Sequence, residues 1–135
     1  MVLTNENYYS PEANQVFMSV SQFKSFEVCE AAAMAELRGE YTRPKTTALL
    51  VGSYVDSWFE GTLNAFKLAN PEIFKRDGTL KADYTQAEKI IERVQRDKLF
   101  VEYMGGEKQR IFTAELFRAP WKIKIDSLLP DKIVD

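Results

Sequence analysis

The spacing of apolar residues changes from a helical to a strand-like period at the pair Gly105-Gly106. Before this pair, apolar residues recur every three or four positions, which is typical of amphipathic helices. After it, segments 109–117, 121–128 and 132–134 are rich in the β-branched and aromatic residues that favour strands. We therefore expect an α/β (α+β) fold, in which N-terminal helices precede an antiparallel β-meander that is incomplete at the C-terminus.

Helical periodicity predicts three main helices, and residues 1–18 precede them as an extended N-terminal arm. Ser19 and Gln22 fit a capping box at the start of the first helix, and Gly39 ends that helix. The helices are expected at about residues 19–38, at 47–60 with a continuation over 62–69, and at 84–104. Residues 19–135 are expected to form the domain.

Histidine is absent from the 135 residues, and Cys29 is the single cysteine. Serine–histidine and cysteine–histidine catalysis and histidine-bound metals are therefore excluded within this chain. Carboxylates and carbonyls remain as metal ligands, and this set favours Mg²⁺ or Mn²⁺ over Zn²⁺. The net charge of −2 predicts no overall basic surface for nucleic acid.

The N-terminal sequence has no charged region followed by an apolar stretch, and the chain contains no run of 18 apolar residues. We therefore expect neither a signal peptide nor a transmembrane helix, and no association with a membrane. Together with the lone cysteine, these features favour a reducing compartment, the cytoplasm of a bacterial cell.

Two acids, Asp126 and Asp135, each follow a short apolar strand segment. Strand alternation places Asp126 on the same face as Lys122 and Lys124. A turn at Pro130 makes the two segments antiparallel and brings the two carboxylates close together. Because like charges at short range repel unless a cation joins them, the pair is a candidate site for a hard divalent metal. The alternative is that Asp126 is a solvated acid on an exposed strand face.

Two further features contain candidate site residues. Glu115 is a lone acid in the apolar segment 112–117, where it suits either a third carboxylate near the metal or an outward-facing strand acid. Gly52 interrupts a strong helical pattern at a cost of roughly 1 kcal/mol, and Asp56 lies one helical turn beyond it. A glycine at such a position indicates close approach by a ligand or another backbone, and a helix crossing explains it equally well.

In this order, the motifs resemble the PD-(D/E)xK nuclease superfamily, and within it the phage and bacterial exonucleases like exodeoxyribonuclease VIII and the RecB-like nuclease domains. The resemblance covers about residues 19–135. It rests on the opening segment Ser-x-Ser-Gln-Phe-Lys-x-Phe-x-x-Cys, on Gly52-Ser53 followed by Asp56 and Gly61, and on the strand acids Glu115, Asp126 and Asp135.

The resemblance implies a restriction-endonuclease-like core, of which residues 19–135 form the N-terminal part. It also implies Mg²⁺- or Mn²⁺-dependent hydrolysis of linear, double-stranded DNA in recombination or repair of the phage type. Asp126 and Asp135 are assigned as catalytic metal ligands, Asp56 takes the metal-ligand position commonly held by histidine, and Glu115 is an accessory catalytic acid. Many such exonucleases form rings, so a homo-oligomer is implied as well.

The chain departs from this pattern in two respects. The family's lysine belongs two residues beyond Asp135, where the chain stops, so we expect this chain to be inactive or weak as it stands. Some relatives hold an iron–sulfur cluster with one early and three late cysteines, but Cys29 alone cannot form one, and a small buried residue on a helix face is its simpler interpretation.

Two other functional interpretations remain open from the sequence. A non-catalytic remnant of a nuclease fold can bind a protein partner through the exposed edge of its last strand and act as an inhibitor or regulator. A helical scaffold domain with a small sheet requires no site at all.

Overall fold

The computed structural model describes residues 1–135, with helices followed by a small sheet, as the period change at Gly105-Gly106 predicts. The helices are α1 (Pro11–Val16), α2 (Val20–Val28), α3 (Glu30–Leu37), α4 (Thr47–Glu60), α5 (Leu63–Ala69), α6 (Ala82–Gln95) and α7 (Lys98–Tyr103), with a 3-10 turn at Pro71–Ile73. The strands are β1 (Glu107–Leu116), β2 (Ala119–Leu128) and β3 (Ile133–Val134), in the sheet order β1-β2-β3. No helix is both long and apolar enough to span a membrane.

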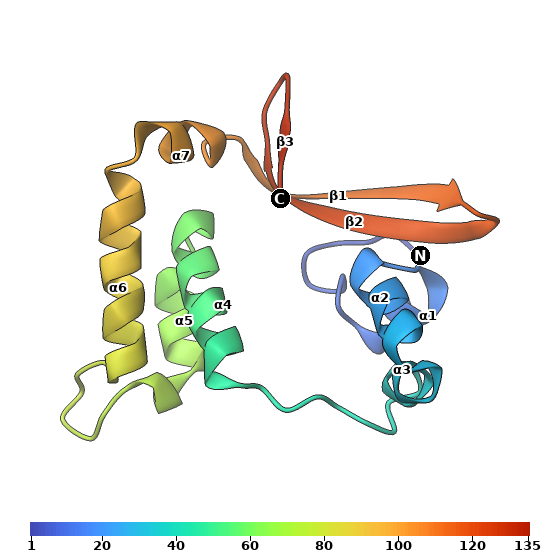
Figure 1. Cartoon of the computed structure of the whole chain (residues 1–135), viewed down its shortest axis with the longest axis horizontal. Coiled ribbons are helices and arrows are strands. Elements are labelled where there is room, and N and C mark those ends of the chain that lie inside the picture. Colours follow the sequence, from blue (N-terminus) through green and yellow to red (C-terminus); the bar gives the residue numbers. More distant parts are fainter.

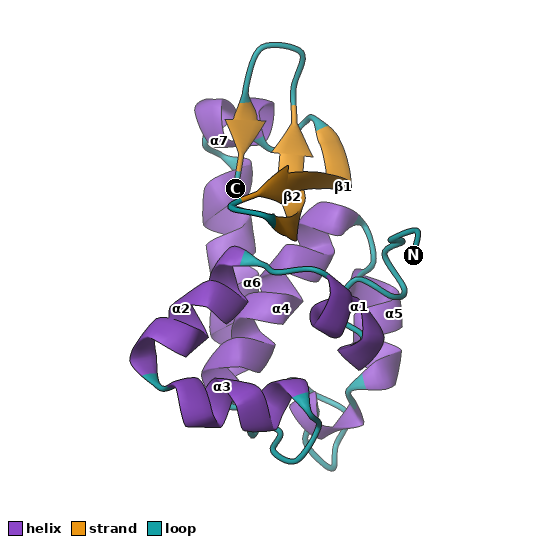
Figure 2. Ribbon diagram, turned by 90° about the vertical axis from the view of Figure 1, so that its right-hand side faces the viewer, coloured by secondary structure: helices purple, strands orange, loops and turns teal.

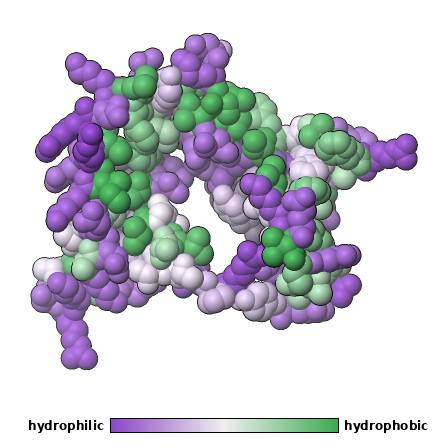
Figure 3. All heavy atoms as spheres, in the orientation of Figure 1, coloured by the Kyte–Doolittle hydropathy of each residue, from purple (hydrophilic) through white to green (hydrophobic).

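The elements surround an open centre (Figure 1). Helices α4, α5 and α6 stand on one side, and α1, α2 and α3 lie beneath the β1–β2 hairpin on the other. The segment 38–46 joins the two sides at the bottom, and α7 leads into the sheet at the top. In the turned view of Figure 2, the strands gather at one end of the molecule. The space-filling view shows a hollow between the two sides (Figure 3).

The larger core lies between α4, α6 and the 3-10 turn. Its buried residues are Tyr54, Ile73, Tyr84, Ala87 and Ile91, with partly buried side chains of α4 and α5 packed around them. Helix α4 has the bounds that the sequence predicts, because local signals define both of its ends. The Thr46 side chain accepts a hydrogen bond from the backbone N–H of Leu49, and Gly61 ends the helix with a φ of 75°.

The N-terminal arm is not extended throughout, so that prediction is wrong for the residues of α1. Ser10 accepts a hydrogen bond from the N–H of Ala13, and Pro11 occupies the first turn, a combination that starts a helix. Next to α1, the backbone of Met18 pairs with Trp121 as an isolated parallel bridge, which attaches the N-terminal segment to β2.

Two of the predicted helices are each divided in two. The capping box of Ser19 and Gln22 forms as predicted, but extended backbone at Cys29 separates α2 from α3. The side chain of Cys29 is exposed there, so its interpretation as a buried residue is wrong. The helix predicted over 84–104 is divided because Asp97 accepts a hydrogen bond from the N–H of Phe100 and caps a new helix, α7.

The strands form the predicted antiparallel meander. Phe117 and Arg118 make a two-residue turn between β1 and β2 with φ values of 53° and 61°, one residue earlier than the sequence predicts. Strand β3 pairs with β2 through Ser127 opposite Val134 and Leu128 opposite Ile133. Strand β3 ends at Val134, one residue before Asp135.

Candidate functional site

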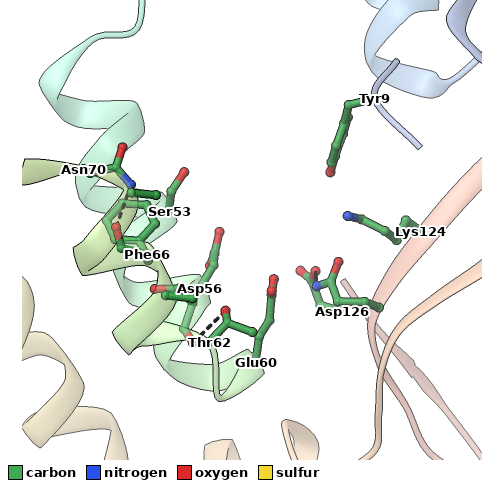
Figure 4. Close-up of a pocket in the computed structure, with 13 residues that line it drawn as sticks. Tyr9, Ser53, Asp56, Glu60, Thr62, Phe66, Asn70, Lys124 and Asp126 are labelled. Atoms are coloured by element: carbon green, nitrogen blue, oxygen red, sulfur yellow. Dashed lines mark hydrogen bonds between the residues drawn. The ribbon is translucent and has the colours of Figure 1, made fainter. Parts of the chain in front are cut away.

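A polar cavity of about 520 Å³ lies between α4 and β2. Helix α4 contributes Asp56 and Glu60, and β2 contributes Lys124 and Asp126. The close-up shows the two acids of α4 on one side of this space and the two β2 residues on the other (Figure 4). Tyr9 closes the rim from the N-terminal segment.

The amphipathic pattern of α4 orients its two acids. Tyr54 is fully buried against α6 and forms the core face of the helix. Asp56 and Glu60 are four residues apart, so they share one face of the helix, and this face differs from that of Tyr54. Packing of the apolar stripe therefore turns both carboxylates toward the cavity.

The sheet supplies the opposite wall. As strand alternation predicts, Lys124 and Asp126 share a face, and both line the cavity. Gln109 stands opposite Asp126 in the β1–β2 register, and its Nε2 donates a hydrogen bond of 3.1 Å to Asp126 Oδ1. The backbone of Gln109 has a φ of 53°, an uncommon conformation for a residue other than glycine.

The charges of the cavity influence one another. Desolvation, and then the charge of Asp126, raises the pKa of Asp56. Desolvation also raises the pKa of Glu60, an effect that Lys124 opposes and the two aspartates reinforce. Desolvation lowers the pKa of Lys108, against the attraction of Asp126 and Glu60. The acids are thus held in a partly desolvated group, where a bound cation would favour their ionised forms.

Of the four acids that the sequence singles out, the structure brings Asp56 and Asp126 together. Asp135 is exposed and lines a neighbouring depression with Tyr9 and Lys124. Glu115 lies beside the hairpin turn opposite Pro120, exposed to solvent. It is six residues along β1 from Gln109, roughly 20 Å away, and it does not line the cavity.

The donor chemistry of the cavity fits a hard divalent cation. No three acidic side chains converge on one point. Mg²⁺ nevertheless binds proteins through one or two carboxylates and completes its coordination with water and substrate phosphates. Asp56 and Asp126 are a suitable pair of such ligands.

Sequence reasoning missed Glu60, Gln109 and Tyr9. The sequence does contain a signal for Glu60, because it follows Asp56 by one helical turn and the two side chains must share one face of the helix. Gln109 had none, because its hydrogen bond depends on the strand register. Tyr9 was assigned to an extended arm, and only the attachment of that arm to β2 brings it to the cavity.

A small antiparallel sheet with helices beside it, and acids from a helix and a strand facing one cavity, are consistent with a PD-(D/E)xK nuclease fold. Residues 19–135 match the family described as "PDDEXK-like domain of unknown function (DUF3799)", and the chain belongs to that family. The predicted family resemblance and fold class are thereby confirmed.

A solved structure supports the same fold. It is the crystal structure of a candidate exonuclease from Eubacterium rectale, which shares 56% sequence identity with this chain at a TM-score of 0.92. The alignment covers 96% of this chain and 51% of that one, so the chain spans about half the length of the solved protein. No curated protein matches the sequence.

Proposed function

We propose that this chain is part of a divalent-metal-dependent exonuclease that hydrolyses linear, double-stranded DNA in recombination or repair of the phage type in the bacterial cytoplasm. The observation that supports it most is the cavity in which Asp56 of α4 meets Asp126 of β2. Membership of a PDDEXK-like family and the similarity to a candidate exonuclease agree with this chemistry. The activity is proposed for the whole protein.

In this proposal, Asp56 and Asp126 hold Mg²⁺ or Mn²⁺. Asp135 would be a further ligand, because extending the β2–β3 register by one residue beyond the pair Ser127–Val134 places it opposite Asp126. A bound cation of this kind supplies Lewis acidity and lowers the pKa of a bound water. Glu60 lines the same cavity, and desolvation raises its pKa, which suits a carboxylate that acts as a general base. The ammonium group of Lys124 contacts a DNA phosphate and offsets the charge of the acids.

The test compares the product of the native gene with three single variants on end-labelled linear duplex DNA. We expect Mg²⁺ or Mn²⁺ to be required for nucleotide release, and covalently closed circular DNA to remain intact. Asp126→Asn and Asp56→Asn should each lower the rate by about 100-fold or more. Glu115→Gln, an exposed acid outside the cavity, is the matched control and should cleave like the wild type. Cleavage that persists with EDTA or in Asp126→Asn would contradict the proposal.

The second candidate function is binding of a protein partner through β3. Strand β3 pairs with β2 through two residue pairs and lies at the edge of the sheet, where Ile133 is 64% exposed. Such an edge can accept a strand from another protein. If this is the function, the native product lacks nuclease activity and retains a partner that Ile133→Lys releases, because a lysine on an edge strand disfavours pairing.

A further inference from the structure

Tyr9 stands at the rim of the cavity with 71% of its surface exposed. Its ring packs edge-on against Tyr8, with the ring centroids 4.9 Å apart at an angle of 86°. The Nζ of Lys124 lies 4.4 Å from the Tyr9 centroid. The close-up shows Tyr9 near Lys124 and across the cavity from α4 (Figure 4). An exposed aromatic ring is thus paired with a cation at the entrance to the acidic group.

A buried lysine holds this part of the chain in place. Lys122 is only 3% exposed, and its Nζ donates hydrogen bonds of 2.6 Å to the carbonyl oxygen of Tyr8 and 2.7 Å to Oδ1 of Asn14. The same ammonium group lies 4.7 Å from the Tyr8 ring centroid. It forms no salt bridge, so its polar contacts attach the N-terminal segment to β2. Tyr8, itself 6% exposed, then supports Tyr9 from behind.

This arrangement adds little to stability at Tyr9 itself. A tyrosine stabilises a fold mainly by burying its ring, and the Tyr9 ring remains largely in solvent. Tyr9 also lies outside residues 19–135, the part that matches the family model. The exposed ring beside Lys124 is therefore available to a ligand that uses the ring face.

We propose that Tyr9 and Lys124 form a nucleotide subsite at the entrance of the cavity. The Tyr9 ring stacks on the base of a strand-terminal nucleotide, and the Lys124 ammonium contacts the adjoining phosphate. Stacking on an aromatic side chain suits any base, and a lysine binds phosphate as a point charge, so the subsite is independent of sequence. The inference rests on the proposed nuclease function and identifies how that site recognises a strand end.

The test uses the native gene product with Asp126→Asn, which prevents consumption of the DNA. The probes are three short single-stranded oligonucleotides, which have 2-aminopurine at the 5′ end, at the 3′ end or in the middle. We expect the fluorescence of one terminal 2-aminopurine to be quenched on binding. Tyr9→Ala should abolish the quenching and raise Kd about tenfold, and Tyr9→Phe should preserve both. Tyr41→Ala, an exposed tyrosine on the segment 38–46, is the matched control and should bind like its parent.

The salt dependence of Kd distinguishes the contribution of Lys124 from that of Tyr9. Lys124→Gln should reduce the slope of log Kd against log salt concentration by about 1, because one phosphate contact is lost, whereas Tyr9→Ala should leave the slope unchanged. The subsite alone fails if the otherwise wild-type protein cleaves DNA and Tyr9→Ala binds with unchanged Kd and quenching. The nuclease proposal fails together with it if the wild type neither binds nor cleaves DNA.

Discussion

Gln109 donates a hydrogen bond of 3.1 Å to Asp126, and it does so from a left-handed backbone conformation with a φ of 53°. The two residues stand opposite each other between the register pairs of Lys108 with Ser127 and Arg110 with Ile125. A non-glycine residue in this conformation costs about 1–2 kcal/mol. Such strain is typical of functional sites, and here it lies beside Asp126, an acid that lines the cavity.

Two substitutions of Gln109 separate the backbone strain from the hydrogen bond. Both Gln109→Gly and Gln109→Ala lose the bond to Asp126, but glycine adopts the positive φ without a Cβ penalty. We expect the free energy of unfolding, measured by urea denaturation, to be about 1 kcal/mol higher for Gln109→Gly than for Gln109→Ala. Both variants should cleave DNA about 10–100-fold more slowly, since Asp126 loses a positioning partner. Equal stability of the two variants would argue against strain at this position.

Gly52 is expected to limit the stability of α4. A Cβ built at this position meets nothing within 4 Å, so neither a close backbone nor a helix crossing within the chain requires glycine there. We expect Gly52→Ala to raise the free energy of unfolding by about 1 kcal/mol, because alanine is the better helix former. Gly61→Ala is the matched control: it also meets no neighbour, but its φ of 75° makes alanine destabilising by a similar amount. A destabilising effect of Gly52→Ala would contradict the prediction.

Asp56 should make the fold less stable as the pH rises from about 4 toward neutrality. Desolvation and Asp126 raise its pKa in the folded state, so the folded chain binds this proton more tightly than the unfolded chain. The free energy of unfolding therefore falls as the pH rises from the unfolded pKa of about 4 through the higher folded pKa. Below about pH 4 the carboxyl group is protonated in both states and this loss disappears.

Asp56→Asn removes this pH dependence. We expect the variant to have a higher Tm than the wild type at pH 7, and the difference to close as the pH falls below about 4. Mn²⁺ should narrow the difference at pH 7, because a cation between Asp56 and Asp126 offsets their repulsion. A difference in Tm that is the same at acidic and neutral pH would mean that the amide acts through packing rather than through charge.

The parts of the fold that the sequence predicts correctly are those that carry a local sequence signal, such as a helix cap or a change of apolar period. The bounds of α4 follow from a threonine cap and a terminal glycine, and the meander follows from the change of period at Gly105-Gly106. The division of α2 from α3 at Cys29 has no comparable signal, because no side chain caps α3 there. Asp97 is a residue type that favours N-caps, but the apolar pattern continues across it, so periodicity alone does not predict the start of α7.

The candidate site depends more strongly on tertiary structure. The sequence pattern singles out Asp56, Asp126 and Glu115, and the family resemblance assigns all three to one site, whereas the register puts Glu115 at the distant hairpin end of β1. Strand alternation predicted the face of Lys122 but not its burial, which requires Tyr8 to fold back onto β2. Contacts of this kind link residues more than 100 positions apart, and no local pattern encodes them.

Gly106 allows the start of β1 to lie close to the end of β2. A Cβ at this position would be 2.5 Å from the carbonyl oxygen of Leu128 and 2.8 Å from Ser127 Oγ. The Gly106 N–H donates a hydrogen bond of 2.9 Å to the same Ser127 Oγ, which in turn donates one of 2.7 Å to the carbonyl of Tyr103. The glycine thus connects α7, β1 and β2 next to Asp126.

Gly106→Ala should lower the free energy of unfolding by about 1–3 kcal/mol, because the carbonyl of Leu128 is paired backbone and cannot move aside as a flexible side chain would. Gly105→Ala is the neighbouring control, since its nearest contact would be 3.2 Å, and it should cost less. The displacement of β2 also moves Asp126, so we expect Gly106→Ala to cleave DNA more slowly even at temperatures where it is fully folded. Calorimetry and a cleavage assay on both variants measure these effects. Equal stability of the two variants would show that the sheet does not require close approach at Gly106.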